Sequence, residues 1–334
     1  MTDVGIRLIE SLFTQLMIDE QWSVHRERGF TWWSYRLAQH VEVSVPFESF
    51  GVDACTVRVW TEMVNHVDPD SNPAEIIRPF NMQTLLSALV WDENTATITE
   101  CSTAVIHDEN FEWLSRTLAT AAILQNAGAH NRARGFAEMT RGVPAATVHP
   151  TSGERPGMDE ILNVPQGIVH EGQQPSRFAG AKVQGVEQFL VDMSFLGSTD
   201  RASLTCEVPF TGSAPVVALS AERGDRLQTS LVQVFTDTPH PDAGSGALML
   251  MRLPISPCAD DALLIANALN KAQAQGESLA HLLGSWCADP TTTDGRTVAY
   301  CCFVPNLLSQ WVRIEDLVLN ASMQSRFAAQ FLNV

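Results

Sequence analysis

The order of the predicted helices and strands repeats along this chain, and no single motif constrains the fold as strongly. Apolar residues at helical spacing predict helices, and runs of β-branched and aromatic residues predict strands. In the first half, the predicted strands are 30–46, 55–67 and 95–107, and the predicted helices are 4–19, 72–89 and one that begins at Asp108. In the second half, the predicted strands are 202–210, 214–221, 226–237, 246–254, 279–287 and 296–304, and the predicted helices are 180–194, 259–276 and 308–332. Each half is thus a helix, antiparallel strands, a helix, further strands and a last helix.

This repeat predicts an α+β protein of two tandem units, each an antiparallel sheet with helices packed on one face. The first unit is expected to span residues 1–132 and the second residues 179–334. Residues 133–178 are rich in Gly, Pro and polar side chains, which predicts a linker with one short helix near 157–163. Such a linker would wrap one unit onto the other, so that a single chain forms an internal pseudo-dimer.

Three stretches of the chain are similar to a known group of proteins: GFTWWSYRLAQHV, then LLGSWC with AYCCFVPN, then LVLNASMQSRFAAQFL. They resemble uncharacterised bacterial proteins related to type III secretion chaperones and to the YbjN-like proteins. The resemblance implies a unit of helix, three strands, helix, two strands and helix, present twice in this chain. It also implies binding of extended segments of client proteins, and it provides no catalytic residues.

Two strands of the second half are apolar on both faces, so each needs a cover on two sides. In 246–254, Met249 and Met251 share one face and leucines the other, whereas 296–304 places Tyr300 and Phe303 on opposite faces. Helices of the same unit can cover one face, and the sister unit, a second chain or a bound peptide must cover the other. These four side chains are therefore candidates for binding a polypeptide, with burial in the core as the alternative.

The strand over 95–107 alternates more cleanly. Ile98 and Ala104 share one face, and Thr97, Thr99 and Thr103 share the other. This alternation predicts that the first face lies in the core and the second in solvent.

Cys287, Cys301 and Cys302 form the densest cluster of reactive residues, and we interpret them as apolar wall residues. Consecutive residues of a strand point to opposite faces, so Cys301 and Cys302 cannot bind one metal ion unless the strand breaks. No Cys-x-x-Cys pair and no nearby histidine completes a set of ligands. We therefore expect no metal and no cofactor, and a redox role is the less favoured alternative.

The charge balance argues against several partners. The chain has 21 Lys and Arg against 38 Asp and Glu, a net charge of −17, which disfavours nucleic acid and anionic membrane surfaces. Arg132, Arg134 and Arg141 form the one basic cluster, a candidate patch for a carboxylate-bearing partner. The alternative is that these arginines only complement the negative end of a helix.

No nucleotide-binding, zinc-protease or nucleophile-elbow motif is found, so no catalytic residue is assigned. The N-terminal stretch lacks the features of a signal peptide, and no apolar run approaches the roughly 20 residues of a membrane helix, which predicts a cytoplasmic protein. The leading hypothesis is a non-enzymatic, chaperone-like adaptor that binds a polypeptide through apolar sheet faces. The alternatives are an enzyme with a dispersed active site in the cleft between the units, and a structural scaffold.

Overall fold

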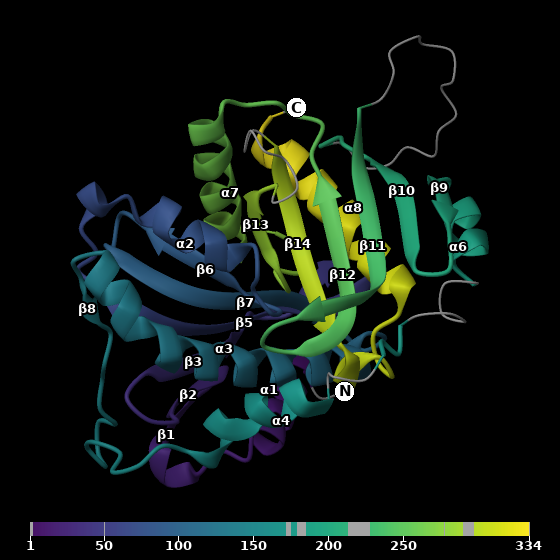
Figure 1. The fold of residues 1–334 in the computed structure, drawn as a ribbon. Helices are drawn as coiled ribbons and strands as arrows, with labels where there is room; N and C mark the ends of the chain where they lie inside the picture. The colour runs from purple at the N-terminus through teal and green to yellow at the C-terminus, as the bar shows by residue number, and fades with distance from the viewer. Residues whose placement is uncertain are drawn as a thin grey trace.

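The computed structural model contains two antiparallel sheets, each with its own set of helices (Figure 1). It describes residues 3–49, 51–171, 175–178, 185–212, 228–276, 278–289 and 297–333. The first half of the chain, purple to blue in Figure 1, and the second half, green to yellow, form two adjoining bodies. The predicted α+β fold with two tandem sheet units is confirmed.

The first unit is built from helices and strands in the predicted order. Its elements are α1 (Val4–Gln15), β1 (Ser23–Arg26), β2 (Gly29–Trp33), β3 (Ala38–Val43), β4 (Phe47–Ser49), β5 (Val52–Asn65), α2 (Pro73–Asn81), β6 (Ala88–Asp92), β7 (Thr97–His107) and α3 (Phe111–Met139). The connecting segment holds β8 (Val143–Pro144), a short 3₁₀ turn (Glu160–Asn163) and α4 (Val164–Glu171).

The second unit repeats this order. Its elements are α6 (Val186–Asp192), β9 (Leu196–Thr199), β10 (Ser203–Pro209), β11 (Thr229–His240), β12 (Gly244–Arg252), α7 (Ala259–Ala274), β13 (Ser285–Ala288), β14 (Val298–Pro305) and α8 (Ile314–Phe331). The strand predicted at 214–221 lies outside the described residues.

The two sheets share one topology. The first runs in the order β1-β2-β3-β5-β7-β6, with β4 and β8 paired to β5, and the second runs β9-β10-β11-β12-β14-β13. Within the described residues, a helix in each unit separates the first four strands of this path, β1, β2, β3 and β5 or β9 to β12, from a final hairpin. The second strand of that hairpin pairs with the last of the four. Counted along this path in the part of the chain that the structure describes, each unit has one strand more before its middle helix than the chaperone resemblance implies, and the first unit adds the short β4.

A pair of asparagines shows the repeat at the level of single residues. Asn81, at the end of α2, donates to the carbonyl of Leu89 and accepts from its N–H, at 2.9 and 2.8 Å. In α7, Asn270 makes the same two bonds to Trp286, again at 2.9 and 2.8 Å. Each asparagine satisfies the outward backbone groups of an edge strand, which would otherwise be open to unwanted pairing.

Several predicted boundaries are wrong for local reasons. The helix predicted over 72–89 ends at Asn81, and its last residues belong to β6. The stretch 30–46 is two strands, because the chain bends between Trp33 and Ala38. Helix α3 begins after Asn110 and runs to Met139, so the first residues assigned to the linker are helical. This helix is the longest described, and none of the described helices combines the length and apolar character that a membrane crossing requires.

The two units meet through equivalent elements. Helix α2 contacts β13, and α7 contacts β6, while α2 contacts α7 directly. Between the units Asn267 bonds to both backbone groups of Trp91, and Lys271 pairs with Asp92 at 2.8 Å. One hydrophobic core cluster includes residues of both units. This reciprocal contact pattern is that of a two-fold dimer interface, here formed within one chain.

The second unit also packs against β7, along the edge that β6 leaves open and, through α7, on the face that carries Cys101. The N–H of Thr103 donates to the carbonyl of Leu282 at 3.2 Å, and the N–H of Val105 donates to His281 Nδ1 at 3.1 Å. Thr103 is therefore buried, although its alternation with Thr97 and Thr99 predicted a solvent face. The alternation predicts burial for β7 in isolation. Near residue 103 the second unit packs against the strand and buries side chains that would otherwise face solvent.

Candidate functional site

The four apolar side chains proposed to bind a polypeptide lie in the interior. Met249, Met251 and Tyr300 have no exposed surface, and Phe303 is 3% exposed. This corrects the expectation that the apolar strand faces offer these residues to a client. Both faces of β12 and β14 are covered within the chain, so no docking surface is formed at these positions.

The covers of β14 explain the cysteine cluster. Cys302 belongs to the core that runs through both units, whereas Cys301 lies on the other face with Cys287, Leu250 and, from the end of α2, Met82. Cys301 and Cys302 thus point to opposite faces, as predicted. The Sγ atoms of Cys287 and Cys301 are 3.4 Å apart. Within the described residues, no group of three metal-ligating side chains is assembled.

The three arginines of the basic cluster are not brought together for one partner. Arg134 is exposed and pairs with Glu138 one turn further along α3, and Arg141 pairs with Asp68 at 2.9 Å. Arg132 instead turns toward the protein and pairs with the buried Glu100 of β7 at 2.6 Å. A patch for a carboxylate-bearing partner is therefore not formed by the three, and Arg132 belongs to a pocket.

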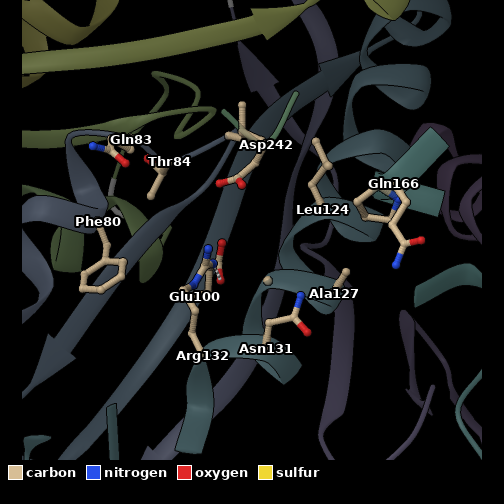
Figure 2. A pocket seen from close by; sticks show the side chains of 13 residues that line it. Phe80, Gln83, Thr84, Glu100, Leu124, Ala127, Asn131, Arg132, Gln166 and Asp242 are labelled. Carbon is tan, nitrogen blue, oxygen red and sulfur yellow. Dashed lines mark hydrogen bonds and ion pairs between the residues drawn. The ribbon is translucent and has the colours of Figure 1, made fainter. Parts of the chain in front are cut away.

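This pocket lies where the two units and the connecting segment meet, and it has a volume of about 410 Å³. The first unit supplies residues after α2, Glu100 of β7 and one face of α3, whereas α4 and the turn between β11 and β12 close it. Figure 2 shows the Asp242 carboxylate pointing into the pocket toward Glu100 and Arg132. The lining residues are Phe80, Gln83, Thr84, Leu85, Glu100, Leu124, Ala127, Gly128, Asn131, Arg132, Pro165, Gln166 and Asp242.

The floor of the pocket is a fixed ion pair. Glu100 is 3% exposed, and its two oxygens accept from Ser87 Oγ at 2.7 Å and from Arg132 Nη2 at 2.6 Å. A buried carboxylate requires such partners, because desolvation of an unpaired charge costs several kcal/mol. Gly128 makes room for the guanidinium, since a Cβ there would lie 2.5 Å from Arg132 Nη2.

The opposite wall is held in place by His240. Its Nε2 donates to the carbonyl of Gln83 at 2.9 Å, and its Nδ1 accepts from the N–H of Asp242 at 3.1 Å. The ring also packs against Phe303, with centroids 4.8 Å apart. Burial lowers the pKa of His240, which favours the neutral ring that can donate at one nitrogen and accept at the other. One histidine thus ties the turn that carries Asp242 to the first unit.

At the equivalent position of the second unit, the described residues form no counterpart of this ion pair. Leu89 pairs with Glu100 across β6 and β7, and Trp286 pairs with Tyr300 across β13 and β14. Leu89 and Trp286 are equivalent, because each is bonded through both backbone groups by an asparagine, Asn81 or Asn270. Tyr300 therefore occupies the position that Glu100 holds in the first unit. The Tyr300 hydroxyl donates to the carbonyl of His281 at 3.0 Å, within the core. The repeat is therefore asymmetric at this position.

The described lining of the pocket is rich in amide side chains. Among the described lining residues there is no histidine, cysteine or lysine, and the Thr84 hydroxyl is already bonded to Ser285 Oγ at 3.0 Å. A hydrolytic or transfer site needs a nucleophile beside a base, and this lining does not place the two together. The side-chain amides of Gln83, Asn131 and Gln166 offer donors and acceptors at the rim.

Sequence reasoning missed this site, although one signal was present. Glu100 shares the core face of β7 with Ile98 and Ala104, and an isolated carboxylate on such a face indicates a buried partner. Asp242 gives no local signal, because its place in the pocket depends on how the second unit meets the first. No protein-family model, curated protein or solved structure matches the chain.

Proposed function

We propose that this protein is a non-enzymatic binding protein that holds a short polypeptide segment in the pocket between its two units. The observation that supports the proposal is the inter-unit pocket itself, to which both units contribute polar side chains. Its volume of about 410 Å³ lies within the range of about 300–1,000 Å³ typical of ligand sites. The binding site proposed here replaces the apolar sheet faces, which are buried.

The lining fits a peptide in two respects. The three rim amides can each donate and accept, as consecutive backbone groups of an extended peptide require. Phe80, Leu85 and Leu124 supply apolar surface for a side chain, with the polar groups at the edge. This combination of an apolar wall and a few placed polar groups is typical of selective binding sites.

The proposal is tested by selecting displayed random peptides on the immobilised wild-type protein and measuring their affinities for two variants. Asn131→Trp places a large ring in the pocket from an exposed position of α3, whereas Arg134→Trp places the same ring at an exposed position of the same helix that does not line the pocket. We expect selected peptides to bind Asn131→Trp about tenfold more weakly or worse, and to bind Arg134→Trp as they bind wild type.

Two results would contradict the proposal. If no peptide is enriched, the burial of every tested apolar face favours the structural scaffold instead. If enriched peptides bind both variants equally, a polypeptide site exists elsewhere on the surface. Circular dichroism of both variants checks that each is folded before affinities are compared.

A further inference from the structure

We propose, resting on the proposed function, that the pocket selects a ligand with one basic group, a lysine ammonium or an arginine guanidinium, and that Asp242 binds it. The inference follows from the charges in the pocket and from the way the second unit presents Asp242. It concerns which chemical group the pocket recognises, whatever the rest of the ligand is.

The charge balance of the pocket leaves one carboxylate without a partner. Glu100 is neutralised by Arg132 and also bonded to Ser87. Within the described residues, the Asp242 carboxylate has no ion pair and accepts no hydrogen bond, because only its backbone N–H is bonded, to His240. The net charge of the described lining is therefore −1, and a bound cation would neutralise it.

The backbone of Asp242 is anchored before any ligand arrives. His240 anchors the turn by bonding both to Gln83 of the first unit and to the Asp242 backbone. An anchored backbone leaves fewer conformations of Asp242 to lose on binding, so more of the charge-assisted hydrogen bond to the ligand is expressed as affinity. His240 is in this sense a positioning residue, and Asp242 is the residue that touches the ligand.

The walls fit the rest of a basic side chain. Lysine and arginine carry an apolar stem below the charged head, and they bury that stem along apolar surface. In Figure 2, Leu124 and Phe80 lie on either side of the space that Asp242 faces. An acidic ligand is disfavoured, because Arg132 is already paired with Glu100 and the whole chain carries a charge of −17.

The test uses small probes that represent only the proposed group. Ethylguanidinium, n-butylammonium and n-butyrate are titrated into the ¹⁵N-labelled full chain, and backbone amide shifts are followed at millimolar probe concentrations. The two cations should produce saturable shifts around Gln83, Asn131 and Asp242, and butyrate should not. Asp242→Asn should weaken cation binding by about tenfold or more.

The matched control is Asp70→Asn, which removes the same charge from an exposed loop of the first unit. It should leave cation binding unchanged. The inference is overturned if butyrate binds as well as the cations, if no cation gives saturable shifts, or if Asp242→Asn and Asp70→Asn behave alike. The last of these outcomes would mean that the cations respond only to the overall charge of the chain.

The same design separates this inference from the proposed function. Peptides that need the open pocket, but keep their affinity when lysine is acetylated or arginine is replaced by citrulline, would support the function and refute the ligand class. Cation binding that depends on Asp242, with no peptide enriched by selection, would support the ligand class and refute the polypeptide function.

Discussion

Lowering the pH should loosen the contact between the two units through His281. The ring of this residue accepts a hydrogen bond at Nδ1 from the N–H of Val105 at 3.1 Å and packs edge-on against Trp113, with centroids 5.9 Å apart. Its backbone carbonyl accepts from Tyr300 and Gln324 of the second unit. Protonation of Nδ1 would remove its lone pair and place a charge between the units, so His281 must stay neutral in the folded protein.

Burial, followed by the nearby His107, lowers the pKa of His281 from 6.5 to about 4. The unfolded chain therefore binds a proton between pH 6.5 and pH 4 that the folded chain excludes. The stability contributed by the neutral ring is complete above pH 6.5 and is lost as the pH falls through this window. At pH 5 the loss amounts to about 2 kcal/mol, an upper figure because part of the side chain stays accessible to solvent.

The assay is urea unfolding followed by circular dichroism at pH 7.5, 6.5, 5.5 and about 5. His281→Asn is the test variant, because its side-chain oxygen can accept from Val105 without titrating. Between pH 7.5 and pH 5 both proteins should lose stability. The loss in free energy of unfolding should be about 2 kcal/mol smaller for His281→Asn than for wild type. His66→Asn removes an exposed histidine and should follow the wild-type slope. Equal losses in wild type and His281→Asn would refute the reasoning.

Three other outcomes are expected. Cleaving the chain within residues 145–155 should leave the fragments associated in size-exclusion chromatography at micromolar concentration, because one core includes both units; folded fragments that separate would contradict the pseudo-dimer. Elemental analysis should find no stoichiometric zinc or iron, and metal that is lost on changing Cys301 to Ser would disprove this. Glu100→Gln should lower the free energy of unfolding in urea by about 1–3 kcal/mol, because it breaks a partly buried pair. Glu138→Gln, which breaks an exposed pair, should cost less than about 0.5 kcal/mol, and similar losses in the two variants would contradict this assignment.

The repeat could be predicted because it rests on local patterns. Periodicity identified the helix of residues 259–276 almost to the residue, and α7 spans Ala259–Ala274 before Gly276, whose φ of +82° ends it. Boundaries failed where tertiary contacts overrode those patterns. The end of α2 is one case, since the chain leaves the helix after Asn81 and returns to the sheet as β6, where Leu89 is bonded to Asn81.

The candidate site could be predicted much less well. The sequence predicted that the strands 246–254 and 296–304 must be packed against on both faces. It did not determine whether the sister unit, a second chain or a bound peptide packs on the second face. The structure shows that Met82 from the first unit lies on the Cys301 face of β14, so the sister unit packs there. A polar pocket built from separate elements leaves no periodic signal, because each residue contributes a single side chain to it.

The asymmetry between the two units follows from the same geometry. At the position paired with Trp286, Tyr300 is fully buried, and its hydroxyl is bonded within the core. With Glu100 at the other position, burial demands a cation, and Arg132 must enter from α3 over Gly128 to supply it. Space beside that guanidinium stays open, and the turn carrying Asp242 reaches it from the second unit. This pocket thus lies beside Glu100 of the first unit, and one ligand per chain is the stoichiometry expected for binding at this site.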